Sequence, residues 1–184
     1  MVEQRRKKRK RRKRRSSKLI DTNIRMINWL PLLTAVAWVD LGVIVLSKFV
    51  PLTQALNRWY ADFGVVAVSS DILIIVLGIA LAQLVYPGIS GWPLVGTAVA
   101  IQLILDILFY LGVIQTVPDG QNKIIDLFKR YAAEGSWKIL LADAGMVAAS
   151  VLLMEFLDNN YSDDQVGFLG VLGVYSLLYI IYTK

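Results

Sequence analysis

The chain of 184 residues contains no cysteine and no histidine. The absence of cysteine excludes disulfide bonds, thiolate nucleophiles and zinc–thiolate sites. The absence of histidine removes the commonest general base and the commonest metal ligand. Charged residues are also sparse, at 18% of the chain, whereas hydrophobic residues make up 56%. Because soluble domains carry about 25% charged and about 45–50% apolar residues, the composition points away from a soluble protein.

Positive charge is scarce in most of the chain and concentrated at its beginning. Residues 1–18 hold twelve Lys/Arg and one Glu, a net charge of +11. Residues 19–184 hold eight Lys/Arg and thirteen Asp/Glu, a net charge of −5. The formal charge of +6 therefore averages a basic tail and an acidic body. The centre of the tail is an unbroken run of basic residues: Arg5, Arg6, Lys7, Lys8, Arg9, Lys10, Arg11, Arg12, Lys13, Arg14 and Arg15.

A basic run of this density repels itself and stays extended until it meets negative charge, so residues 1–18 are predicted to form a disordered polybasic tail. Three partners are physically adequate: anionic lipid headgroups, a nucleic acid bound by counterion release, or an acidic protein surface. No aromatic residue interrupts the run, which argues against base stacking. The simpler alternative is a topology anchor or a localisation-like cluster. Residues 19–29 are a juxtamembrane segment, either an interfacial helix or a short solvated linker.

Long apolar runs make up most of the remaining chain. Five of them approach the roughly 20 residues that a helix needs to cross a bilayer, at 30–50, 65–86, 93–114, 137–157 and 166–183. Breakers such as Pro51, Pro87 and Pro118 separate the runs, and Trp and Tyr side chains flank them, as is typical of a bilayer interface. We therefore predict an all-α integral membrane protein, in which residues 30–184 form a bundle of about five transmembrane helices.

The one sizeable loop, 115–136, contains an amphipathic pattern that predicts an interfacial helix at 122–134. Ile124, Ile125, Phe128 and Tyr131 share one face of this helix, and Asp126 and Arg130 form an i, i+4 pair on the other. A helix of this kind lies in the headgroup plane and stabilises lipid contact. The alternative is a docking surface for a partner.

The positive-inside rule places the basic tail on the cytoplasmic side, which puts the C-terminus on the opposite side if there are five spans. With the tail on the cytoplasmic side, most of the remaining Lys/Arg lie in loops on the far side of the membrane, and this distribution alone would favour the reverse orientation. These residues are Lys48, Arg58, Lys123, Lys129, Arg130 and Lys138. The density of the tail is expected to dominate.

One aspartate falls inside each of four predicted spans, with no Lys or Arg at comparable depth. Alternating topology puts Asp40 near mid-membrane and the other three toward the far half, at similar height. Gln102, Asp106 and Tyr110 follow one another at i, i+4 and i+8, so they form one polar stripe on a helix. Ionisable residues at such depth are costly and mark candidate functional sites. The predicted intramembrane polar cluster contains Asp40, Asp71, Gln102, Asp106, Tyr110 and Asp143.

The carboxyls of this cluster have two interpretations. They either hold the helices together, protonated or hydrogen-bonded to neighbouring polar groups, or they line a proton or cation route. A small proton or cation transporter or channel is therefore the main alternative function. An intramembrane aspartyl protease is not supported, because neither the Gly-x-Gly-Asp motif nor the Tyr-Asp motif of that family is present. No catalytic residue, metal ligand set or cofactor is predicted, since the chain has no nucleophile–base constellation or cofactor loop.

Several segments between residues 57 and 160 resemble a family of small multi-pass membrane proteins encoded by large nucleocytoplasmic DNA viruses. The segments that carry the resemblance are Trp59-Tyr60-Ala61-Asp62-Phe63-Gly64, Ser69-Ser70-Asp71-Ile72-Leu73, Asp106-Ile107-Leu108-Phe109-Tyr110, Val117-Pro118-Asp119-Gly120-Gln121-Asn122 and Asp126-Leu127-Phe128-Lys129-Arg130-Tyr131-Ala132. The chain departs from the family pattern in two places. Leu105 stands where a His often precedes the Asp, and Ala142-Asp143-Ala144 stands where Gly-Asp-Ser is frequent. These departures weaken any relay role that a His would have carried.

The resemblance implies a structural role in an icosahedral double-stranded DNA virus whose inner lipid membrane derives from the host endoplasmic reticulum. It implies a minor capsid protein of that membrane, with lipid, capsid proteins or other minor capsid proteins as partners. The tail at 5–15 would then contact capsid proteins, anionic lipid or packaged DNA. A homo-oligomer is compatible with this role.

Overall fold

The structure is a computed structural model that describes residues 27–50, 53–135 and 137–183. The basic run 5–15 and most of the juxtamembrane segment lie outside the described residues. Of the described residues, 85% are helical, which confirms the all-α prediction. Four helical segments are long and apolar enough to cross a membrane: α2 (Trp29–Phe49), α4 (Val65–Val85), α5 with the π-helix η1 (Gly91–Ile114), and α7 (Trp137–Asn160).

The fifth expected span corresponds to α8 (Asp163–Ile180), an 18-residue helix that is not among the four segments long and apolar enough to cross a membrane. It begins with a capping box, in which the Ser162 side chain accepts from the Gln165 backbone N–H and the Gln165 side chain accepts from the Ser162 backbone N–H. Asp163 and Asp164 occupy the first turn, where negative charge interacts favourably with the helix dipole. The local sequence therefore fixes the start of α8, while a count of five membrane spans stays a prediction.

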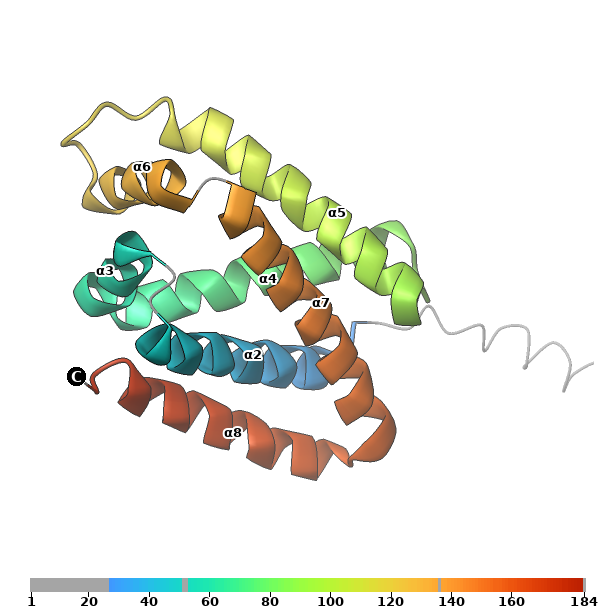
Figure 1. The fold of residues 1–184 in the computed structure, drawn as a ribbon. Helices are drawn as coiled ribbons and strands as arrows, with labels where there is room; N and C mark the ends of the chain where they lie inside the picture. The colour runs from blue at the N-terminus through green and yellow to red at the C-terminus, as the bar shows by residue number, and fades with distance from the viewer. Residues whose placement is uncertain (1–26, 51–52, 136, 184) are drawn as a thin grey trace, which may run out of the picture.

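Helix α2 lies at the centre of the bundle, as Figure 1 shows, with α8, α7 and α4 packed around it. Helix α5 lies on the far side of α4 and α7. Two long-range hydrogen bonds join α2 to α8: Thr34 Oγ1 donates to the Val166 carbonyl at 3.3 Å, and Trp38 Nε1 donates to the Leu169 carbonyl at 3.0 Å. The first described helix and the last are thereby locked together.

The long helices alternate in direction, so the bundle has two unlike ends (Figure 1). The cap end carries two short helices, α3 (Gln54–Phe63) and α6 (Lys123–Gly135), together with the C-terminal residues. The turn end carries the start of α2 and two tight connections, at 86–90 and 161–162. The expected helix at 122–134 corresponds to α6, but its apolar residues Ile125 and Leu127 are buried, and α6 packs on α3.

The buried apolar residues form two clusters, one toward each end. The turn-end cluster includes Leu32, Ile79, Leu94 and Val151, contributed by four different helices. The cap-end cluster gathers side chains from α2, α3, α4, α6 and α8: Ala37, Ile44, Ala55, Leu56, Trp59, Tyr60, Ala67, Val68, Leu127 and Leu177.

The outer surface of the long helices is apolar. Leu84, Phe168 and Val171 are each exposed over about 70% of their surface, at 69%, 70% and 72%. Soluble monomers rarely expose large contiguous apolar patches, whereas a bilayer provides apolar chains to cover them. The exposed side chains support an integral membrane protein, in agreement with the four apolar helices.

We expect Gly170→Ala to weaken the packing of α8 on α2. A Cβ at this position would lie 2.7 Å from Thr34 Oγ1, and Thr34 is held by its bond to α8. Overpacking of this kind costs about 1–3 kcal/mol. Thermal unfolding in detergent should show a lower Tm for Gly170→Ala. The control is Gly167→Ala on the same helix, where nothing lies within 4 Å; an equal loss in both variants would contradict the prediction.

Candidate functional site: a buried carboxyl cluster beneath the cap helices

Helix α3 is the element of the cap that the sequence analysis missed. It begins at Thr53, whose side chain accepts from the Leu56 backbone N–H at 3.0 Å, and it ends at Gly64, whose φ of 48° breaks the chain into α4. The signal for this helix is the spacing of Ala55, Leu56, Trp59 and Tyr60, which places four apolar side chains on one face. The helix was missed because it is only ten residues long and sits between two long apolar runs.

Asp71, in the second turn of α4, is bound by side chains from α3. Trp59 Nε1 donates to both carboxyl oxygens, at 3.2 and 3.1 Å, and Tyr60 Oη donates to Oδ2 at 2.9 Å. Both aromatic side chains are buried. A carboxyl within the apolar helix α4 therefore fixes the position of the short helix α3.

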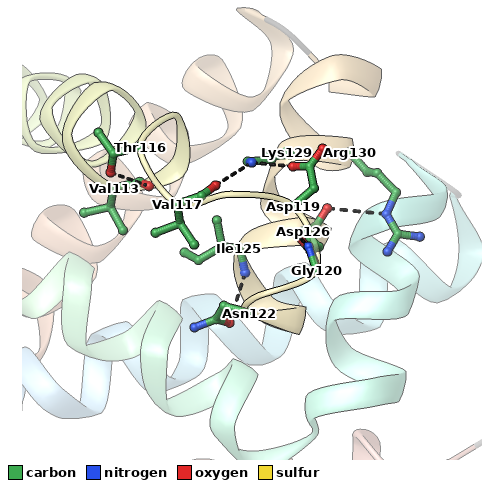
Figure 2. A network of polar contacts seen from close by, with 10 residues as sticks. All are labelled: Val113, Thr116, Val117, Asp119, Gly120, Asn122, Ile125, Asp126, Lys129 and Arg130. Carbon is green, nitrogen blue, oxygen red and sulfur yellow. Dashed lines mark hydrogen bonds and ion pairs between the residues drawn. The ribbon is translucent and has the colours of Figure 1, made fainter.

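Helix α6 completes the cap, and the loop that precedes it is held by a network of polar contacts (Figure 2). Asn122 caps α6 by accepting from the Ile124 N–H at 2.9 Å, and Lys129 donates to the Val117 carbonyl at 2.7 Å and pairs with Asp119. The expected Asp126–Arg130 side-chain pair is replaced by a different arrangement. The Asp126 carboxylate accepts from Gly120 N at 3.1 Å, and Arg130 Nε donates to the Asp126 main-chain carbonyl.

The stripe predicted on α5 is only partly realised. Gln102 Nε2 donates to Asp106 Oδ1 at 2.7 Å, so these two residues form a pair. Tyr110 is 39% exposed and begins the π-helix η1 (Tyr110–Ile114), where its N–H is shared between the carbonyls of Asp106 and Ile107. The wide turn follows Tyr110, because the Gln115 N–H donates to the Tyr110 carbonyl, while Tyr110 itself keeps an α-helical backbone. The exposed side chain of Tyr110 makes no hydrogen bond to Asp106 among the described residues, so the stripe ends at Asp106.

Asp40 is the most deeply buried member of the cluster. Its side chain is 0% exposed, and neither carboxyl oxygen has a hydrogen-bond partner among the described residues. A charged or polar group buried without a partner is destabilising. Asp40 therefore does not act as a hydrogen-bonding link between helices in this structure, in contrast to Asp71.

The four aspartates lie within electrostatic range of one another in a chain of pairs. Asp40 interacts with Asp71, and Asp143 interacts with both Asp106 and Asp71. The structure thus brings together the carboxyls expected at similar depth and adds Trp59, Tyr60 and Tyr131 from the cap. Within residues 27–50, 53–135 and 137–183, no group of three acidic side chains is placed to hold a metal ion.

The charges of these carboxyls act on two buried tyrosines of the cap, Tyr60 and Tyr131. Burial raises the pKa of the Tyr60 phenol above its usual value, and the charges of Asp71 and Asp40 raise it further. Burial also raises the pKa of Tyr131, with added contributions from the charges of Asp143 and Asp71. Both phenols therefore stay protonated over the physiological range, and Tyr60 acts as a hydrogen-bond donor to Asp71.

We expect Tyr60 and Tyr131 to ionise only after the exposed tyrosines in an alkaline titration followed by phenolate absorbance. Because their folded pKa values exceed the unfolded ones, the stability they contribute is complete below the unfolded pKa. It is lost as pH rises toward the folded pKa. Tyr60→Phe should remove one late-titrating group, whereas the matched change of the exposed Tyr86 should leave the late-titrating groups unchanged. Early ionisation of Tyr60 would contradict its burial.

A separate polar site lies at the turn end. A small cavity of about 60 Å³ is lined there by Asn28, Gln83, Ser90, Glu155 and Asp158, among others. Asn28 Nδ2 donates to Asp158 Oδ1 at 2.8 Å, and the Glu155 carboxylate accepts from the Gly91 N–H. The apolar turn-end cluster, with Leu32, Ile79 and Val151 at its centre, lies between this cavity and the carboxyls beneath the cap. The two polar sites are therefore separated by mostly aliphatic side chains, among which Ser150 is buried without a hydrogen-bond partner in the described part of the chain.

Comparisons with known proteins gave no assignment: no protein-family model, curated protein or solved structure matches the chain significantly.

Proposed function

We propose that the chain is a structural multi-pass membrane protein that anchors a basic arm, residues 5–15, at the bilayer surface and ties the membrane to an acidic partner. Four apolar helices and their exposed aliphatic surface support the membrane anchor. We further propose that α8 is a fifth span, because it packs along α2 and directs Phe168, Val171 and Tyr175 outward. Five spans put the two ends of the chain on opposite sides of the membrane.

The observation that carries this proposal is the charge of the turn end, where the arm joins the bundle. Its charged side chains among the described residues are all acidic: Glu155, Asp158, Asp163 and Asp164. All the positive charge of this side therefore belongs to the segment that precedes Ile27. A surface built this way repels polyanions close to the bundle and attracts them only through the arm.

The resemblance to small membrane proteins of large DNA viruses gives the proposal its specific form. In that form the chain is a minor capsid protein of the virion inner membrane, and the arm contacts the shell, anionic lipid or packaged DNA. The lipid-covered bundle holds the protein in the membrane, and the arm supplies salt-sensitive contacts that need no fixed sequence in the partner.

Two measurements test this function. In purified particles, quantitative mass spectrometry before and after mild detergent should show retention with the shell, at a copy number commensurate with capsid symmetry. In reconstituted vesicles of neutral lipid, the full chain should capture double-stranded DNA or capsid protein at low salt. A chain with residues 5–15 replaced by Gly and Ser should not. Loss with the lipid, or capture that survives the replacement, would overturn the linking role.

A proton or cation transporter is the second candidate, and the buried, unpartnered carboxyl of Asp40 favours it. The largely aliphatic layer between the carboxyl cluster and the turn-end cavity weighs against it, because a transport route needs water or polar groups along its whole length. Ser150 and Gln83 are the buried polar side chains on that side, and their unpartnered oxygens form no hydrogen-bonded chain among the described residues. Liposome flux assays decide between the two. Flux that Asp106→Asn abolishes would support transport, whereas absence of flux is expected for the structural protein.

A further inference from the structure

The buried polar atoms that lack a partner are all of one kind. Within the residues that the structure describes, six buried side-chain atoms have no hydrogen-bond partner, and all six are oxygens. Four of them belong to the cluster beneath the cap, on Asp40, Gln102 and Asp106. Asp40 and Gln102 are exposed over only 0% and 2% of their surface. Buried acceptors without donors are costly, so the group that completes this site must supply hydrogen or positive charge.

The arrangement of the carboxyls indicates which ligand the site binds. No three acidic side chains in the described ranges are close enough together to ligate one metal ion. The titratable groups around the site come one from each of six helices: Asp40, Tyr60, Asp71, Asp106, Tyr131 and Asp143. Helix α8, on the other side of α2, presents main-chain carbonyls to Thr34 and Trp38. Each carboxyl is separate from the others and has no basic partner at its depth. Each can therefore bind only one small cation by itself, and that cation is the proton.

The surroundings of the cluster also indicate the side from which protons enter. Toward the turn end, the cluster is closed by the aliphatic side chains of Ile79, Val147 and Val151, all less than 5% exposed. Toward the cap end, it meets the polar edges of Trp59 and Tyr60, which donate to Asp71. Polar groups that hydrogen-bond to the carboxyls lie toward the aqueous phase at the cap end. On the turn side, Ser150 Oγ and Gln83 Oε1 are isolated oxygens without a hydrogen-bond partner among the described residues, so they form no continuous polar path.

We propose that Asp40, Asp71, Asp106 and Asp143 form a proton-binding site that is entered from the cap end and closed toward the turn end. A proton adds to a carboxylate oxygen and leaves a neutral carboxylic acid, so no other reactant is required. Protonation of Asp71 removes the charge that Trp59 and Tyr60 stabilise through their hydrogen bonds. Helix α3 therefore reports the protonation of the cluster at the membrane surface, and this property is independent of what the basic arm binds.

Infrared spectroscopy of the reconstituted full chain tests the site directly, through the carbonyl stretch of protonated carboxylic acids. The wild type should show this band at neutral pH, where exposed aspartates are ionised. Asp40→Asn should remove part of the band, whereas the control Asp164→Asn, an exposed residue in the first turn of α8, should leave it unchanged. A wild-type spectrum without the band, or an unchanged band in folded Asp40→Asn, would overturn the proposal.

A second measurement on the wild type keeps the test independent of variant folding. In vesicles with a buffered lumen and known protein orientation, the pH of one side at a time is changed while tryptophan fluorescence is followed. The difference between wild type and Trp59→Phe isolates Trp59. Its signal should follow the pH on the cap side only, and Asp71→Asn should abolish the response. A response to the turn side, or proton flux across the vesicle, would contradict a one-ended site.

Discussion

Replacing residues 5–15 by an uncharged segment of equal length is expected to invert the protein in the membrane. Positive residues close to the spans decide orientation, and acidic residues count for little. Among the described residues, the cap end carries six Lys/Arg and the turn end carries none; the six are Lys48, Arg58, Lys123, Lys129, Arg130 and Lys138. The arm outweighs this bias only while its charges are present. Without them, the bundle directs its cap end to the cytoplasm.

The lack of cysteine makes this orientation measurable without removing any native thiol. Single cysteines replace Ser90 at the turn end and Gln121 at the cap end, both exposed. With the arm intact, a membrane-impermeant maleimide should label position 121 from the far side and leave position 90 protected. Replacing the arm should exchange the two patterns in roughly half or more of the molecules. Unchanged labelling would show that the apolar bundle alone determines orientation.

Asp71→Leu is expected to lower the free energy of unfolding by about 2–5 kcal/mol, because the buried donors of Trp59 and Tyr60 each lose their acceptor. The damage should centre on α3, which depends on this carboxyl for its polar contacts with α4. Thermal unfolding in detergent gives the magnitude, and proteolysis between α3 and α4 reports local release. Asp71→Asn, whose amide oxygen can still accept, should keep most of the stability. Equal loss in both would assign the effect to charge.

Asp40→Leu is expected to act in the opposite direction and raise the Tm. The carboxyl of Asp40 makes no hydrogen bond among the described residues, so a leucine, which branches at the same atom, removes a desolvated polar group without orphaning a partner. The same thermal unfolding experiment measures the change. A large loss of stability would mean that Asp40 serves packing rather than proton binding. A gain of stability for Asp40→Leu and a loss for Asp71→Leu would show that these two aspartates, which look alike in the sequence, have different roles.

The sequence predicts the parts of this fold that follow from composition and period. Long apolar runs give the four apolar helices because a helix that crosses a bilayer needs length and hydropathy and little else. The amphipathic period of residues 122–134 predicts α6. The expected depth of Asp71, Asp106 and Asp143 follows from alternating direction alone. Each of these inferences uses local sequence or simple counting along the chain.

What the sequence could not predict depends on tertiary contacts. The burial of α6 against α3 needs the position of Trp59, whose ring lies 4.8 Å from that of Phe128, centre to centre. The difference between Asp40 and Asp71 depends on which donors other helices bring near, since both are lone aspartates in apolar runs. The exposure of Tyr110 depends on which surface the neighbouring helices leave uncovered.

The central place of α2 also has a consequence for biosynthesis. Three side-chain hydrogen bonds join its N-terminal part to residues 130–132 positions later in the chain. Chains emerge from the ribosome N-terminus first, at about 5–20 residues per second, so α2 enters the membrane many seconds before α8 can meet it. During that interval, Thr34 and Trp38 lack their acceptors. A chain truncated before Asp163 would keep α4 and α7 beside α2 but would leave these two donors without the carbonyls of α8.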